Sequence, residues 1–190
     1  MTPVLDHPEV RESLMPISVE FYHELGRLGM IGEEVELLEG FLIRKMSKSP
    51  LHETIVRRFS KVLLDCLPAG FFLVKESPLT LEFSEPEPDL AVIAGDPEEF
   101  VSNHPSTAAI IVEVAVSTVQ KDRSKAAIYA AAGVGEYWLI EPERKCLTVY
   151  RLPGIKGYCE AVTFNNESSV VSSVLPGFSI SLPDLFRSTR

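Results

Sequence analysis

The segment from Ala108 to Val116 is the feature that most constrains the fold of this chain. Its residues, Ala-Ala-Ile-Ile-Val-Glu-Val-Ala-Val, are apolar apart from Glu113. A short and nearly continuous apolar run is typical of a central β-strand that is covered on both faces. A carboxylate buried in such a strand is costly unless it is paired, protonated or bound to a cation. The segment therefore predicts a covered sheet and a special environment for Glu113.

Helical and extended segments are mixed around this strand. Long helices are predicted over 50–67, where Ser49 can act as N-cap, and over 122–132, which Gly133 can close. A short helix is predicted over 18–26, which Gly26 ends, and a hairpin over 34–46, which turns at Glu39-Gly40. The predicted strands lie over 71–75, 79–83, 89–94, 137–140 and 147–151, and two or three more lie over 159–182. This order favours an α+β fold with a mixed central sheet flanked by helices, with additional strands and hairpins.

Length and composition limit the class of protein. The 190 residues fit one domain over 1–190, in which the proline-broken residues 1–16 form a loose lead-in. No apolar run approaches the roughly 20 residues of a membrane-spanning helix, so no membrane partner is expected. The three cysteines form no CxxC pair, which is typical of reduced thiols in a cytoplasmic protein. The net charge of −9 disfavours a simple DNA-binding module, although a nuclease that neutralises its carboxylates with metal stays compatible with it.

Asp89 is a second carboxylate in an unusual position, because it opens the apolar strand over 89–94. If Asp89 and Glu113 lie at matching height on two strands, four carboxylate oxygens surround one point. Such ligands suit a hard divalent ion, Mg²⁺ or Mn²⁺. Taken alone, Asp89 is typical of a turn residue that follows proline, and Glu113 is explained equally well by a buried ion pair with an arginine or lysine. Taken together, the two carboxylates favour a metal site.

Lys125 is the candidate for a third catalytic group. On a helix that begins near Asp122 it lies in the first turn, from where its side chain can reach back over the end of the Glu113 strand. A lysine there can orient or help to deprotonate a water molecule and stabilise charge on phosphorus. Asp122, three residues earlier, could hold the lysine in place. A solvated lysine near a helix start is an equally good interpretation.

Four ordered motifs resemble the Uma-type family of proposed bacterial endonucleases, which belongs to the restriction-endonuclease-like PD-(D/E)xK superfamily. They are Glu-Pro-Glu-Pro-Asp-Leu-Ala-Val-Ile (85–93), Ile-Val-Glu-Val-Ala-Val-Ser-Thr (111–118), Asp-Arg-Ser-Lys (122–125) and the Tyr-Ala-Ala-Ala-Gly-Val-Gly-Glu-Tyr-Trp-Leu-Ile run (129–140). The similarity covers roughly two thirds of the chain, and the ordered set is more specific than any single motif.

The resemblance implies roles for individual residues. Pro88-Asp89 matches the PD element and Glu113 the acidic residue of (D/E)xK. Ala115 stands where the superfamily usually has lysine, and the lysine is displaced to Lys125. Two further polar residues, Glu36 and His52, match positions near the same cleft.

Both of these polar residues also have ordinary structural interpretations. Glu36 could face solvent on the hairpin, and His52 is typical of a polar contact at a helix N-terminus. Tyr129, Tyr137 and Trp138 are expected in the core.

The implied function is a Mg²⁺-dependent endonuclease that hydrolyses DNA phosphodiester bonds. Asp89, Glu113 and the backbone carbonyl of Val114 would bind the metal. The alternative is a catalytically silent binding or scaffold protein of the same fold. By analogy with nucleases that pair to cut two strands, a homodimer is expected. The chain contains no GxSxG, P-loop, GxGxxG or HExxH motif, which excludes the enzyme classes that depend on them.

Overall fold

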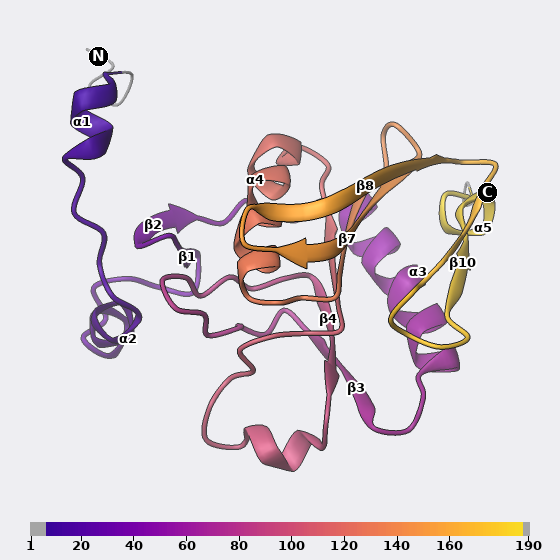
Figure 1. The fold of residues 1–190 in the computed structure, drawn as a ribbon, viewed down its shortest axis with the longest axis horizontal. Helices are drawn as coiled ribbons and strands as arrows, with labels where there is room; N and C mark the ends of the chain where they lie inside the picture. The colour runs from indigo at the N-terminus through magenta and orange to yellow at the C-terminus, as the bar shows by residue number, and fades with distance from the viewer. Residues whose placement is uncertain (1–6, 188–190) are drawn as a thin grey trace.

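The centre of the protein is a six-stranded mixed sheet (Figure 1). The structure, a computed structural model, describes residues 7–187. In spatial order the strands are β3 (Phe71–Lys75), β4 (Leu90–Ala94), β5 (Ile110–Val114), β6 (Glu136–Glu141), β7 (Cys146–Gly154) and β8 (Gly157–Asn165). Strands β5 and β6 are parallel, and the other neighbours in this sheet are antiparallel. The expected α+β architecture with a mixed central sheet is confirmed.

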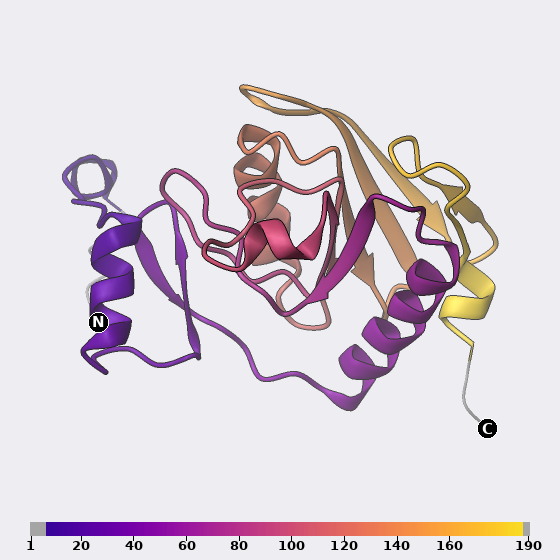
Figure 2. The same cartoon turned by 90° about the horizontal axis from the view of Figure 1, so that it is seen from below.

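Two long helices cover opposite faces of this sheet (Figures 1 and 2). Helix α3 (Pro50–Cys66) packs Ile55, Phe59 and other apolar side chains on one face, together with alternate residues of β4 and β5. Helix α4 (Val119–Ala131) packs on the other face through Tyr129. Every residue of β5 is buried, which confirms that its nearly continuous apolar sequence belongs to a central strand covered on both faces.

An N-terminal group of elements lies beside the sheet (Figure 1). It contains α1 (Pro8–Glu12), α2 (Val19–Arg27) and the antiparallel hairpin of β1 (Val35–Leu38) and β2 (Phe41–Arg44). Gly40 turns the hairpin at a φ of +79°, and a Cβ there would lie 2.2 Å from Cβ of Pro16, so both conformation and space require glycine. The amide of Glu85 donates to the carbonyl of Leu37, which joins β1 to the approach to β4.

The C-terminal elements complete the core on the α3 side. Strands β9 (Ser169–Val171) and β10 (Ser179–Ser181) form a second two-stranded sheet, followed by α5 (Leu182–Leu185), and their apolar residues join the α3 cluster. Buried Glu136 on β6 accepts hydrogen bonds from Arg151, Ser172 and Ser173, which ties this segment to the central sheet.

Most predicted elements are present, one predicted strand is absent, and the bounds of two helices differ from the prediction. Residues 79–83 form no strand, because the amides of Leu79 and Leu81 bond to nearby loop carbonyls instead of a neighbouring strand. Helix α4 begins at Val119, so Lys125 lies in its second turn and not in its first. Helix α2 continues through Gly26 and ends at Arg27. The predicted lead-in over 1–16 contains α1, while residues 1–6 lie outside the described part of the chain.

A remaining structural element is the short 3₁₀ helix over Pro97–Phe100, which follows β4. Within residues 7–187, no helix is long and apolar enough to cross a membrane.

Candidate active site

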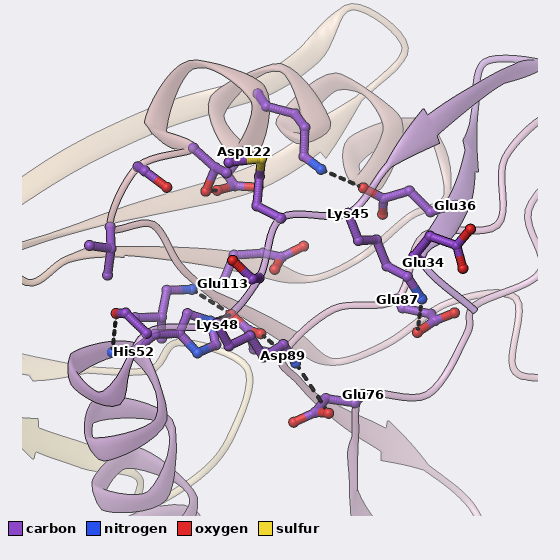
Figure 3. A pocket seen from close by; sticks show the side chains of 18 of the residues that line it. Glu34, Glu36, Lys45, Lys48, His52, Glu76, Glu87, Asp89, Glu113 and Asp122 are labelled. Carbon is purple, nitrogen blue, oxygen red and sulfur yellow. Dashed lines mark hydrogen bonds and ion pairs between the residues drawn. The ribbon is translucent and has the colours of Figure 1, made fainter. Parts of the chain in front are cut away.

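A cleft of about 910 Å³ lies where β4 and β5 meet the N-terminal hairpin and the first turns of α3 and α4 (Figure 3). It is rich in charge. Eight carboxylates line it, from Glu33, Glu34, Glu36, Glu76, Glu87, Asp89, Glu113 and Asp122, and four lysines, Lys45, Lys48, Lys121 and Lys125. The excess of carboxylates over lysines makes this cleft a favourable place for an added cation.

Asp89 and Glu113 occupy opposite positions in the backbone register at the cleft end of two neighbouring strands. Leu90 on β4 pairs with Val112 on β5, and the strands are antiparallel. Extending this register by one residue places Asp89 opposite Glu113. Side chains alternate along strands, so Glu113 follows Ile111 onto the face that α4 covers. The two residues therefore lie at matching height in the sheet, as the sequence predicted, while their side chains bond to different helices, Asp89 to α3 and Glu113 to α4.

Asp89 is held by hydrogen bonds from two different elements. Nε2 of His52 on α3 lies 2.9 Å from its Oδ2, and the amide of Val114 donates to the same oxygen at 2.8 Å. Burial raises the pKa of Asp89, but the bonds from His52 and Val114 and the charge of Lys48 outweigh it and hold the pKa below its ordinary value. Asp89 is therefore an oriented, ionised carboxylate.

His52 is a buried histidine with one unused ring nitrogen. An ionised carboxylate can only accept, so Nε2 carries the proton that is donated to Asp89, and Nδ1 of a neutral ring is an acceptor. Nδ1 is buried and has no hydrogen-bond partner among residues 7–187, and Oε1 of Glu53 lies 3.9 Å away, beyond hydrogen-bond distance. Because His52 lines the cleft, a bound water or substrate donor would satisfy this nitrogen.

Glu113 has a different environment from Asp89. Nζ of Lys125 and the hydroxyl of Tyr129 both donate to its Oε1 at 3.0 Å. Burial raises the pKa of Glu113 to about 8; Lys125 opposes this shift, and the nearby carboxylates, Asp89 first, add to it. The spacing of Lys125 and Tyr129 by four residues places both on the face of α4 that covers Glu113.

Lys125 lies among three carboxylates. Its Nζ is 3.0 Å from Oε1 of Glu113, 3.1 Å from Oε2 of Glu36 and 4.0 Å from Oδ1 of Asp122. Burial lowers the pKa of Lys125, but the three carboxylates outweigh burial and hold the pKa above its ordinary value. The ammonium group is consequently a permanent positive charge, although only 3% of the residue is exposed.

Glu36 and Asp122 support this arrangement. Glu36 is 1% exposed and also bonds Lys121 at 2.8 Å, so the interpretation of Glu36 as a solvent-facing hairpin residue was wrong. Burial raises the pKa of Glu36, and Lys125 and Lys121 outweigh it, so the pKa is lowered. The hydroxyl of Thr118 donates to Asp122, whose pKa burial nevertheless raises.

The seven residues that the sequence suggested for the site all line this cleft: Glu36, His52, Asp89, Glu113, Val114, Asp122 and Lys125. Their catalytic roles stay predictions. Val114 contributes its amide to Asp89, and a metal-binding role for its carbonyl also stays a prediction.

Three further residues of the site were not among the site residues that the sequence predicted. Lys121 and Tyr129 repeat the spacing of α4 around Lys125, which is a signal that could have found them. Tyr129 is in the core as expected, and its hydroxyl adds the unexpected bond to Glu113. Lys48 precedes α3 in an irregular segment and has no comparable signal.

Comparison with known proteins identifies the family. The model of the Uma2 family, described as "Putative restriction endonuclease", matches residues 20–183. The chain belongs to the Uma2 family. The match includes all seven candidate site residues and confirms the family resemblance of the four motifs. No curated protein matches the sequence.

The fold of this Uma2 protein is similar to that of a crystal structure titled as a "putative nuclease belonging to DUF820" from Anabaena variabilis ATCC 29413. The two share 21% sequence identity with a TM-score of 0.76, and the alignment covers 90% of this chain and 98% of the other. At this identity the comparison confirms the fold.

The oxygen atoms of the cleft fit a hard cation better than a soft one. Asp89 and Glu113 offer carboxylate oxygens, and the hydrogen bonds described to each carboxylate end on one oxygen, Oδ2 of Asp89 and Oε1 of Glu113. Within the described residues, no three His, Cys, Asp or Glu side chains are arranged to hold a metal. A site with few protein ligands suits Mg²⁺, which keeps several of its own waters.

Proposed function

We propose that this Uma2 protein is an endonuclease that hydrolyses phosphodiester bonds of DNA, with Mg²⁺ or Mn²⁺ held by Asp89 and Glu113. The observation that carries the proposal is that Asp89 and Glu113 line one cleft from neighbouring register positions, with the ammonium of Lys125 at 3.0 Å from Glu113. The family description supports a nuclease and hence a DNA substrate.

The residues around the pair have distinct tasks in this proposal. A divalent cation would supply Lewis acidity, favouring ionisation of water and neutralising charge on the phosphate. His52 and the amide of Val114 orient Asp89 for that cation. Lys125 presents its fixed charge to the phosphate as negative charge develops in the transition state. Its raised pKa favours this role over that of a proton acceptor.

One observation favours the alternative of a silent binding protein. Each lysine of the cleft is already paired with at least one carboxylate, and Ala115 stands at the usual place of the lysine. A protein of this kind would bind the cation or DNA without cutting. A cleavage assay separates the two functions.

The test is nicking of supercoiled plasmid with Mg²⁺ or Mn²⁺, compared with the same reaction in EDTA. We expect metal-dependent nicked and linear products, and a loss of at least about a hundredfold in rate for Asp89→Ala. The matched control is Asp65→Ala, which removes an exposed carboxylate on α3 and should cleave like the wild type.

Two results would contradict the proposal. Equal cleavage by Asp89→Ala and wild type would assign the activity to another site or to a contaminant. Metal binding in calorimetry without any cleavage would favour the silent protein.

A further inference from the structure

Lys48 is a cation beside the candidate metal site that the proposed mechanism does not use. It lies in the irregular segment between β2 and α3, and Figure 3 shows it next to Asp89. Its Nζ is 3.5 Å from Oδ1 of Asp89 and 3.2 Å from Oε2 of Glu76. Both bonds described to Asp89 end on Oδ2, so Lys48 contacts the oxygen that those bonds leave open.

Lys48 is held more loosely than the other lysines of the cleft. Its side chain is 34% exposed, against 26% for Lys121, 24% for Lys45 and 4% for Lys125. The shortest ion pair of each of those three lysines is 3.0 Å or less, and the shortest of Lys48 is 3.2 Å. The 3.2 Å pair with Glu76 is partly exposed on both sides and contributes little free energy, so a cation that supplies positive charge to Asp89 can displace Lys48.

A divalent cation and Lys48 compete for the same oxygen. A cation that binds Oδ1 of Asp89 would lie close to the ammonium and be repelled by it. The displaced ammonium stays on the rim of the cleft, because its segment is anchored at Ser49, the N-cap of α3. The phosphate of a nucleic acid is the anion that would then enter beside it.

We propose that Lys48 occupies the cation position at Asp89 while the site is empty and contacts the substrate phosphate once the cation has bound. This inference rests on the proposed function, since it requires both a cation at Asp89 and a nucleic acid in the cleft. It makes Lys48 a substrate-binding residue that also lowers metal affinity in the absence of substrate.

The first measurement is calorimetric titration of the full chain with Mn²⁺ and with Mg²⁺ in the absence of DNA. Lys48→Met removes the charge and keeps much of the side-chain length, so metal should bind about tenfold more tightly. Lys45→Met is the matched control, because it removes the same charge from the same cleft but pairs with Glu87 and not with Asp89. Its effect on metal affinity should be much smaller.

The second measurement is the salt dependence of binding to a short labelled DNA duplex, with Ca²⁺ in place of Mg²⁺. Lys48→Met should weaken binding about tenfold and reduce the slope of log K against log salt by about one, the value for one lost phosphate contact. Lys48→Arg keeps the charge and should restore most of the slope. Damage to the fold alone would not tighten metal binding while weakening DNA binding.

The outcomes separate this inference from the proposed function. Tighter metal binding together with a smaller salt slope supports both roles of Lys48. Normal metal binding and nicking in the wild type, with metal affinity and salt slope unchanged in Lys48→Met, would overturn the inference alone. A wild type that binds no Mn²⁺ or Mg²⁺ would overturn the proposed function and this inference with it.

Discussion

Lys125 shows how one buried residue can hold several acidic side chains together. Three carboxylates surround its buried ammonium, and their combined charge keeps it protonated against the cost of burial. When Glu113 is ionised, the same ammonium also neutralises part of the repulsion between Glu113 and Glu36. Breaking a buried ion pair from one side leaves charges without compensation, which is strongly destabilising.

Lys125→Met should therefore abolish cleavage and also lower the free energy of unfolding by about 3 kcal/mol in EDTA. Mg²⁺ should restore part of that stability, because it replaces the lost positive charge. Lys125→Arg should retain little cleavage, because Lys125 is only 3% exposed and its buried site does not accommodate the broader guanidinium group. Urea denaturation with and without Mg²⁺, together with nicking, measures these effects. Lys61→Met, an exposed substitution on α3, is the control, and normal cleavage by Lys125→Met would show that the lysine has no part in catalysis.

At the scale of elements, the start of α3 decides the geometry of Asp89. The hydroxyl of Ser49 caps this helix by accepting a hydrogen bond from the amide of His52. The ring of His52 in turn hydrogen-bonds the carboxylate of Asp89. Helix α2 has the same kind of cap, because Ser18 accepts the amide of Phe21. The two caps are chemically alike, and only the first supports the site.

Ser49→Ala and Ser18→Ala should each lower the free energy of unfolding by about 1 kcal/mol, the usual effect of a lost N-cap. Only Ser49→Ala should also weaken Mg²⁺ binding, because fraying of the first turn of α3 releases His52. Denaturation curves and metal titrations of both variants test this difference. If Ser18→Ala weakened Mg²⁺ binding equally, the effect would come from general stability and not from the orientation of Asp89.

At the scale of the whole molecule, Glu113 makes the stability of the fold depend on pH. Burial raises the pKa of this carboxyl to about 8, against an ordinary value of 4.5. Between these two values the folded protein keeps a proton that the unfolded chain has lost, so the contribution of Glu113 to stability decreases as pH rises through this range. A bound cation requires the ionised carboxylate, so metal affinity should change in the opposite direction.

The increase in melting temperature that millimolar Mg²⁺ produces should therefore be larger above pH 8 than at about pH 6.5. Glu113→Gln should lose most of the increase in melting temperature that Mg²⁺ produces. In EDTA, the melting temperature of this variant should fall less than that of the wild type as the pH is raised. Thermal denaturation over a pH series, with Mg²⁺ and with EDTA, gives both results. A Mg²⁺ effect of equal size at all pH values would contradict a proton on Glu113.

Local patterns in the sequence predicted the framework of the site. The apolar run of β5 indicated a covered central strand with one exceptional carboxylate, and Ser49 with Pro50 indicated the start of α3. These signals are short-range, because burial on both faces, helix caps and glycine turns each depend on a few consecutive residues. The same signals were less reliable at ends of elements, as the earlier start of α4 at Val119 illustrates.

The sequence by itself determined the strand that Asp89 immediately precedes, the strand that carries Glu113 and the helix that carries Lys125, together with the family they indicate. Only the tertiary structure decided which charges meet. Glu36 and Lys121 are 85 residues apart, yet they form a 2.8 Å ion pair. Lys48 reaches Asp89 from a segment without any periodic pattern. No local spacing relates such residues, because their contact depends on how the hairpin and the start of α3 pack against the sheet edge, and long-range packing sets that geometry.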